Sequence, residues 1–260
     1  MLQKYLSKFV LPAVAAVALL VSAPAQAENF TKDQINEMIG DYIKANPQVI
    51  LQAVNDYQTR EMSEKQEEAL KRNHDEIFRN EKSPFLGNKD GDVTIVEFFD
   101  YNCHYCKDVF PVLRDLTKED PKLKVIFKDF PILGPASEVG AKWALAAQRQ
   151  DKYFEFHQKL MDHKGPLKNE DIEAAAKDIG LDLSAARSYV DGTDVMMQIE
   201  RNRTLAGQMN FNGTPSFIVN DEAFSGVPDA QSLKEKIASK RAALKDKGSD
   251  GHKKDEKKAD

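Results

Sequence analysis

The spacing of apolar and polar residues divides this chain into segments of different predicted structure. Residues 9–21 form one short apolar run. From about residue 31 to 57, apolar residues recur every three or four positions, which predicts amphipathic helices. Residues 58–82 are strongly polar and charged. After residue 84, short apolar runs alternate with helical patterns, so the rest of the chain is predicted to form an α/β domain.

Residues 28–82 are predicted to form a helical segment. Thr31 and Gln34 have the capping-box spacing, and Asn46-Pro47 predicts the start of a second helix. That second helix would be about 50 Å long at roughly 1.5 Å per residue, and its charged half has little to bury. The two short amphipathic helices could fold back onto the main domain, or they could self-associate and leave the charged helix as a solvated arm. We favour self-association because the short helices are amphipathic and the connecting helix is not.

Residues 83–244 are predicted to form the main domain. A strand, a helix and a second strand make a βαβ unit, a helical insert follows, and a hairpin and a last helix complete the domain. A charged tail is expected to be disordered. The expected ranges are strand 93–99, strand 124–130, insert 134–207, strand 215–219, strand 223–225, helix 229–244 and tail 245–260.

The first 27 residues have the pattern of a secretory signal peptide. Lys4 and Lys8 precede the apolar run, and Ala25-Gln26-Ala27 matches a cleavage site. The apolar core is short for a transmembrane span. We therefore expect export to the periplasm, a compartment in which disulfides persist.

The net charge of the chain excludes one class of partner. The formal charge is −5, and removal of Lys4 and Lys8 with the signal peptide leaves −7. No basic stripe of the kind found in nucleic-acid binders is present in the sequence. Nucleic acid is therefore not an expected partner.

Cys103 and Cys106 are the only cysteines, and they lie three residues apart between the first strand and its helix. This spacing is too short for a structural staple, and a zinc site would ordinarily need four ligands that the sequence does not supply. A Cu(I) site made by the two thiolates stays open. At a helix N-terminus, Cys103 would be held as a thiolate, the attacking species in disulfide exchange, with Cys106 as the resolving thiol.

The order of elements, with C-x-x-C at the first strand–helix junction, resembles the thioredoxin fold of the DsbA family over about residues 84–244. Pro111 falls five residues after Cys106, Glu97 falls six before Cys103, and Thr214-Pro215 precedes the late strand. The resemblance implies an α/β thioredoxin fold with a helical insertion, here preceded by an N-terminal α-helical oligomerisation segment.

The resemblance also implies roles for individual residues. Glu97 would be a buried proton acceptor for Cys106, although an edge residue facing water stays open. Thr214-Pro215 would form a cis-proline loop that faces the disulfide and offers backbone groups to a substrate chain. His104 would add a hydrogen bond or positive charge to the thiolate, and Tyr105 would contact substrate.

Two departures from DsbA indicate a particular branch of the family. The residues between the cysteines are His104-Tyr105 where DsbA has Pro-His, and Thr214 stands where DsbA has valine and DsbC-type isomerases have threonine. With the helical extension, the chain resembles the oligomeric, ScsC-like branch.

This resemblance implies a periplasmic thiol–disulfide oxidoreductase that forms or isomerises disulfides without a cofactor. Its partners would be exported proteins with cysteines and a membrane redox protein of DsbB or DsbD type. The chain would assemble as a homodimer or homotrimer. The alternatives are a monomeric dithiol oxidase and a non-enzymatic envelope protein that binds copper through the two cysteines.

Overall fold

The structure is a computed structural model that describes residues 30–256, and side chains as far as residue 246. The predicted signal peptide, residues 1–27, lies outside this range. The chain divides into two units, residues 1–54 and 55–260, which are described separately. Across residues 30–256, no helix combines the length and the apolar character needed to cross a membrane.

The first unit contains helix α1 (Lys32–Ala45) and the start of α2 (Gln48–Arg72). The predicted capping box is confirmed, since Thr31 Oγ1 accepts the Gln34 N–H at 3.2 Å and Gln34 Oε1 accepts the Thr31 N–H at 2.9 Å. No residue of α1 is buried. The exposed large apolar side chains of this unit are Phe30, Ile35, Met38, Ile39, Tyr42, Val49, Ile50, Leu51 and Val54.

The second unit is built on a five-stranded sheet in the order β1-β3-β2-β4-β5. The central strand β2 runs parallel to β3 and antiparallel to β4, while β1 and β5 lie antiparallel at the edges. The predicted βαβ unit and late hairpin are confirmed, whereas the short edge strand β1 is not among the predicted elements. The strands are β1 (Phe85–Gly87), β2 (Val93–Phe99), β3 (Leu123–Asp129), β4 (Ser216–Val219) and β5 (Glu222–Ser225).

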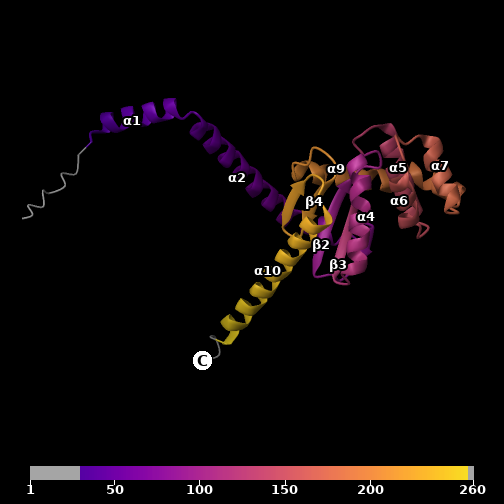
Figure 1. The fold of residues 1–260 in the computed structure, drawn as a ribbon. Coiled ribbons are helices and arrows are strands. Elements are labelled where there is room, and N and C mark those ends of the chain that lie inside the picture. The colour runs from indigo at the N-terminus through magenta and orange to yellow at the C-terminus, as the bar shows by residue number, and fades with distance from the viewer. Residues whose placement is uncertain (1–29, 257–260) are drawn as a thin grey trace, which may run out of the picture. The chain divides into compact units, whose positions relative to one another are not determined.

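The helices of the second unit include the predicted insert between β3 and β4. Helices α5, α6 and α7 gather at one end of this unit (Figure 1). Gly165 and Gly180 have positive φ at the chain reversals before and after α7, a conformation that glycine adopts without steric cost. The helices are α3 (His74–Phe78), α4 (His104–Glu119), α5 (Pro135–Gln148), α6 (Tyr153–Asp162), α7 (Asn169–Asp178), α8 (Leu183–Val190), α9 (Thr193–Gln208) and α10 (Ala230–Glu256).

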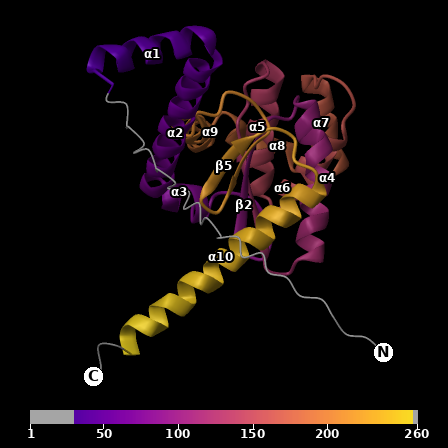
Figure 2. The ribbon, with the colours of Figure 1, turned by 60° about the vertical axis from the view of Figure 1, so that its left-hand side comes forward.

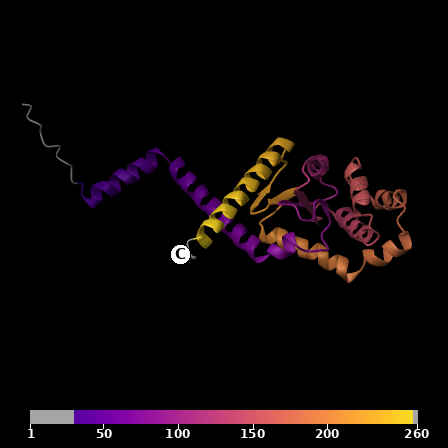
Figure 3. The ribbon, with the colours of Figure 1, turned by 90° about the horizontal axis from the view of Figure 1, so that it is seen from below.

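The sheet is covered by helices on both faces. Ile95 and Phe99 belong to the apolar cluster that includes residues of α4, α10 and the insert, whereas Val96 and Phe98 belong to a second cluster with residues of α2, α3 and α9. Figure 3 shows α4 and α10 on one side of the strands and α9 on the other. Because side chains alternate along a strand, the first face carries every odd-numbered residue of β2, including Glu97.

The prediction of a solvated arm over residues 58–82 is wrong for its second half. Ala69, Leu70 and Ile77 are buried against the sheet, and Gln66 Nε2 donates to the Met209 carbonyl at 2.7 Å. A few apolar residues among many charged ones give almost no amphipathic pattern in the sequence, so the packing of this segment could not be predicted from periodicity. Each of these apolar side chains can nevertheless pack against the sheet on its own.

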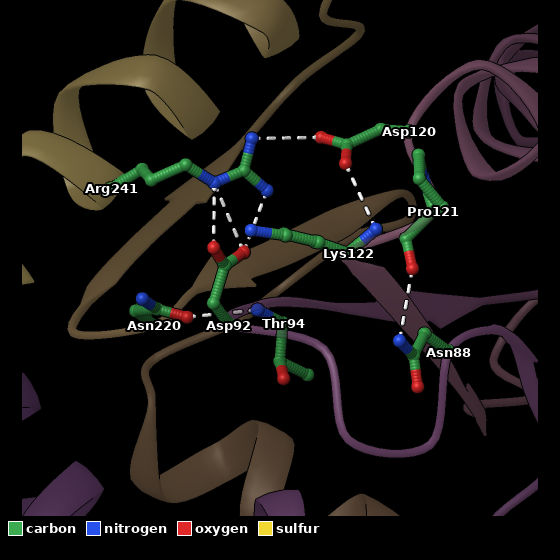
Figure 4. Close-up of polar contacts among 8 residues, drawn as sticks. All are labelled: Asn88, Asp92, Thr94, Asp120, Pro121, Lys122, Asn220 and Arg241. Atoms are coloured by element: carbon green, nitrogen blue, oxygen red, sulfur yellow. Dashed lines mark hydrogen bonds and ion pairs between the residues drawn. The ribbon is translucent and has the colours of Figure 1, made fainter.

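Helix α10 packs across the first face of the sheet, in front of β2 in Figure 2. Arg241 joins it to the start of β2, since its guanidinium donates to Asp92 at 2.6–3.0 Å and to Asp120 at 3.0 Å (Figure 4). The Arg241 guanidinium beside Asp92 lowers the pKa of that carboxyl. Helix α10 continues to Glu256, beyond the predicted end at residue 244 and over part of the predicted disordered tail. Once a helix has formed, each further residue that joins it adds one backbone hydrogen bond, so a packed helix can extend into the chain that follows.

Candidate active site

The two cysteines lie where the chain turns from β2 into α4. Cys103 is the N-cap of α4, and its backbone N–H donates to the Asp100 carbonyl at 3.0 Å. The Cys106 N–H, one of the unsatisfied donors of the first helical turn, points at Cys103 Sγ from 3.4 Å. Cys103 keeps 5% of its surface exposed and Cys106 none, so solvent reaches only the first sulfur.

The surroundings of Cys103 favour the thiolate. A hydrogen bond from the Cys106 thiol is the largest cause that lowers the pKa of Cys103 to about 6. The backbone N–H groups of Cys106 and Tyr105 act in the same direction, and burial opposes them. The positive end of α4 acts in the same direction. The hydrogen-bond donors around Cys103 Sγ therefore agree with the prediction of a thiolate at the start of α4.

Cys106 lies in the opposite environment. Burial, followed by its hydrogen bond to Cys103 and the nearby charges of Glu97 and Cys103, raises the pKa of the Cys106 thiol far above its usual value. A thiol held neutral beside a thiolate is the asymmetry that a resolving cysteine needs.

Glu97 is fully buried on the central strand, so the alternative that it is an edge residue facing water is wrong. Neither carboxyl oxygen has a hydrogen-bond partner within the described residues. Burial first, and then the charge of Cys103, raise the pKa of Glu97 well above its usual value. A buried carboxyl whose pKa is raised and whose charge acts on Cys106 can exchange a proton with that thiol.

Thr214 and Pro215 lie directly before β4, the antiparallel neighbour of β2. Their peptide bond is cis, as the sequence predicts. The Cys103 thiol donates to the Thr214 carbonyl at 3.1 Å. The structure thus brings together Glu97, the Cys103–Cys106 turn and the Thr214-Pro215 loop from three stretches of chain.

His104 and Tyr105 have exposed side chains. The His104 side chain is 81% exposed, and its Nε2 lies 3.4 Å from Asp108 Oδ2. Tyr105 is 57% exposed, and its ring contacts that of His104 with centroids 5.9 Å apart. No described contact joins His104 to Cys103 Sγ, so its role in stabilising the thiolate stays a prediction. The predicted contact of Tyr105 with substrate likewise stays a prediction.

Two residues that sequence reasoning missed hold the active-site turn. The buried Asp100 carboxylate accepts backbone N–H groups from Asn102 at 2.7 Å, Ile132 at 2.8 Å and Leu133 at 2.9 Å. Asn102 accepts the Leu167 N–H at 2.7 Å through Oδ1. Asp and Asn just before the cysteines were the available signal, since both types bond nearby backbone in turns. Their distant partners could not be read from the sequence.

A second missed feature is a group of buried polar side chains beneath the active site. Tyr101 Oη lies 3.0 Å from His157 Nδ1, and the Tyr153 hydroxyl donates to Asp129 Oδ2 at 3.4 Å. Asp129 Oδ1 and His157 Nε2 have no partner within the described residues. Burial raises the pKa of Asp129 to about 8 and lowers that of His157 to about 3.

Apart from the two thiols, few side chains here could hold a metal. Among the side chains that the structure describes, residues 30–246, no three His, Cys, Asp or Glu side chains cluster in a way that could bind one.

Comparisons with known proteins agree with this geometry. Residues 94–238 match the DSBA-like thioredoxin domain family, and residues 32–63 match the copper resistance protein ScsC N-terminal domain. The two matches cover the α/β part and the N-terminal helices separately.

Solved structures of similar proteins cover much of the chain. A thioredoxin-like oxidoreductase from Silicibacter pomeroyi is 36% identical, with a TM-score of 0.63 over 65% of this chain and 97% of that one. A linker-deletion mutant of Proteus mirabilis ScsC is 26% identical, with a TM-score of 0.66 over 84% of this chain and 99% of that one. The ScsC match includes more of this chain than the thioredoxin-like domain alone.

Curated relatives include disulfide bond formation protein D of Bacillus subtilis, 26% identical over 59% of this chain and 75% of that protein. The Na(+)/H(+) antiporter NhaA 1 of Salinispora arenicola is 28% identical over 59% of this chain, but the match spans only 24% of the antiporter. The family match covers more than half of the chain and includes both cysteines. The chain therefore belongs to the DSBA-like thioredoxin domain family of thiol–disulfide oxidoreductases, and its similarity to ScsC is consistent with the ScsC-like branch.

Proposed function

We propose that this protein is a periplasmic thiol–disulfide oxidoreductase that forms and isomerises disulfides in exported proteins through Cys103 and Cys106. The observation that carries the proposal is the pairing of a Cys103 thiol whose pKa is lowered to about 6 with a buried, neutral Cys106. Location in the periplasm is supported by the signal-peptide pattern of residues 1–27.

In oxidation, a substrate thiolate attacks Cys103 of the Cys103–Cys106 disulfide, and Cys106 leaves as a thiolate that takes a proton from Glu97. A second substrate thiolate attacks the mixed disulfide, forms the substrate disulfide and releases Cys103 as a thiolate. Two electrons pass from the substrate to the cysteine pair. In isomerisation, the reduced Cys103 thiolate attacks a substrate disulfide, and another substrate thiolate displaces it, so that no net electrons are transferred.

Self-association through the N-terminal helices is part of the proposal. The apolar face of α1 and the start of α2 is exposed. Exposed apolar surface of this extent is typical of an interaction site. Several catalytic sites held in one assembly would raise the effective concentration of thiol around a bound substrate and so favour reshuffling. A DsbB- or DsbD-type membrane protein would keep the cysteine pair oxidised or reduced.

The reaction is tested by reactivation of scrambled ribonuclease with wild type and Cys103→Ser. We expect the variant to lose essentially all activity, because the serine hydroxyl is not ionised at neutral pH and forms no mixed disulfide. Equal rates for the two proteins would rule out the enzyme.

Removal of residues 28–60 tests the role of the helices. This deletion ends before the buried Ala69 and Leu70, so the second unit keeps its packing. We expect a monomer by light scattering that oxidises dithiols at the wild-type rate and loses most isomerase activity. An unchanged mass would show that α1 and α2 do not assemble the protein.

Two alternatives predict different results from the same preparations. A monomeric dithiol oxidase would show monomer mass before the deletion. A copper-binding envelope protein would bind Cu(I) through both thiolates and show no reactivation. Residues 32–63, which match the ScsC N-terminal domain, contain no cysteine or histidine, so the sulfur atoms that they could offer to copper are the thioethers of Met38 and Met62. The contrast between the lowered pKa of Cys103 and the raised pKa of Cys106 favours the redox enzyme.

A further inference from the structure

Lys107 lies one turn into the active-site helix, and its side chain reaches the helical insert. Its backbone N–H donates to the Cys103 carbonyl at 3.2 Å, so it stands one helical turn after Cys103. Its Nζ donates to the His163 carbonyl at 2.7 Å and lies 3.5 Å from the Gly165 carbonyl. Both acceptors belong to the loop between α6 and α7. The side chain therefore joins the helix that carries the cysteines to the insert.

The same loop is also bound by the turn before the cysteines. Asn102 accepts the Leu167 N–H through Oδ1 at 2.7 Å and donates through Nδ2 to Ser137 Oγ at 3.0 Å. Asn102 precedes Cys103 and Lys107 follows Cys106, so the loop is held from both sides of the cysteine pair. A loop fixed at two points gives the Lys107 ammonium a defined position, whereas the flexible stem of a free surface lysine samples many rotamers.

The acceptors of Lys107 are neutral carbonyls, which distinguishes it from other lysines of the same unit. Lys118 on α4 lies 3.4 Å from Asp115, and Lys159 on α6 lies 3.2 Å from Asp178. Among the side chains that the structure describes, no carboxylate lies within ion-pair distance of Lys107 Nζ. Carbonyl oxygens fix an ammonium group without cancelling its charge, so the charge still acts on neighbouring groups.

The negative charges that act on Lys107 are those of Asp100 and Cys103. Burial is the largest influence on the pKa of Lys107 and lowers it, whereas these two charges raise it. The interaction is mutual, so the ammonium of Lys107 also favours the thiolate form of Cys103. The other titratable side chains around these residues are Glu97 on β2, His104, Cys106 and Asp108 on α4, and Asp162, His163 and Lys164 of the insert.

We propose that Lys107 is a positioning residue of the active site: the loop between α6 and α7 holds its ammonium in place, and this fixed positive charge favours the Cys103 thiolate. The inference rests on the proposed function, because the thiolate is both the species that attacks a substrate disulfide and the group that leaves a mixed disulfide. Lys107 forms no bond in either step and gives up no proton. It acts through Cys103, by stabilising the negative charge on that sulfur.

Four full-length, reduced proteins test this role: wild type, Lys107→Met, Lys107→Arg and Lys118→Met. Methionine removes the charge and the hydrogen bonds, whereas arginine keeps the charge and can donate to the carbonyls. Lys118→Met is the matched control, because it makes the same change in net charge on the same helix, at an exposed lysine paired with Asp115. The measurement is the pH midpoint of Cys103 alkylation by iodoacetamide.

We expect Lys107→Met to raise the midpoint by about half a unit, because a charge that acts across partly solvated space contributes less than the hydrogen bonds to the sulfur. The equilibrium constant with glutathione should shift about threefold towards the disulfide, which corresponds to a potential about 15 mV less oxidising. Salt at about 1 M should reduce the difference from wild type, since it screens the charge. Lys107→Arg and Lys118→Met should keep the wild-type midpoint.

An unchanged midpoint in Lys107→Met, or an equal rise in Lys118→Met, would overturn the inference and leave the enzyme intact. A rise that does not respond to salt would assign the effect to displacement of the loop, and would overturn it as well. If Lys107→Met does not fold, Lys107→Gln gives the same comparison, since it keeps an N–H donor but no charge. Absence of ribonuclease reactivation by wild type would instead overturn the proposed function, while the alkylation midpoints would still be measurable.

Discussion

Cys103 is expected to react with iodoacetamide at half its maximal rate near pH 6, because its pKa is lowered to about 6 from an ordinary value of 9.0. An unperturbed thiol would be only about 0.1% ionised at that pH. The measurement is the alkylation rate of the reduced protein between pH 4 and 9, with the modified residue identified by mass. A midpoint near 9 would contradict the account of the active site given by the structure.

The variant Cys106→Ala tests the cause of the shift. The hydrogen bond from the Cys106 thiol is the largest contribution to the lowered pKa of Cys103, and alanine removes it while leaving the backbone N–H in place. The midpoint should rise by roughly one unit, and not the full three, because the helix N-terminus and the backbone donors remain. An unchanged midpoint would assign the shift to the helix alone.

The same shift makes the stability of the reduced protein depend on pH. The folded pKa lies below the unfolded one, so the stabilising contribution is present above about pH 9 and is lost as pH falls through 6. Between pH 5 and 8 the reduced protein should gain about 2 kcal/mol over the oxidised protein, less than the roughly 2.7 kcal/mol of two full pKa units because solvent screens the sulfur. That gain corresponds to about 45 mV toward a more oxidising disulfide.

Features that depend on local periodicity could be predicted from the sequence. Strand 93–99 is a continuous apolar run, and the helix after it carries apolar residues at helical spacing, so the junction that holds both cysteines was fixed by adjacent residues. The capping box at Thr31 is likewise a local pattern. Elements of this kind form from interactions within a few residues.

Features that depend on distant partners could not be predicted. Strand β1 has three residues and owes its pairing to β3, about forty residues away. Leu70 and Ile77 lie in a highly charged segment and are buried against the face of the sheet that carries Val96 and Phe98. Asp100 reads as a turn residue, yet two of its three N–H partners come from a loop more than thirty residues later. Tertiary contacts decide all of these.

Asp129 is the clearest case of a polar residue whose environment only the structure reveals. It is the last residue of β3, it is buried, and one carboxyl oxygen has no partner among the described residues. Tyr153 donates to its other oxygen, and Asp100 adds a nearby negative charge. Burial is the largest cause of a pKa raised from 3.8 to about 8, so the carboxyl is protonated in the folded protein at neutral pH.

Replacement of Asp129 by asparagine should therefore stabilise the protein increasingly as pH rises. The folded pKa of Asp129 lies above the unfolded value, so its contribution to stability is fully present below about pH 3.8 and is lost as pH rises to about 8. Asparagine does not ionise, so the variant does not lose this contribution to stability as pH rises. Between pH 5 and 8, urea unfolding should show Asp129→Asn gaining up to about 4 kcal/mol over wild type, from three units at about 1.36 kcal/mol each.

Asp100→Asn is the matched control. The side chains of Asp100 and Asp129 are both buried, but only in Asp100 do both carboxyl oxygens accept hydrogen bonds. It accepts three backbone N–H groups, and an amide nitrogen cannot accept in place of an oxygen. We expect Asp100→Asn to lose about 1–3 kcal/mol. A pH-independent difference between Asp129→Asn and wild type would show that Asp129 ionises in the folded protein as it does in water. The buried carboxyl would then need a hydrogen-bond partner that compensates for burial.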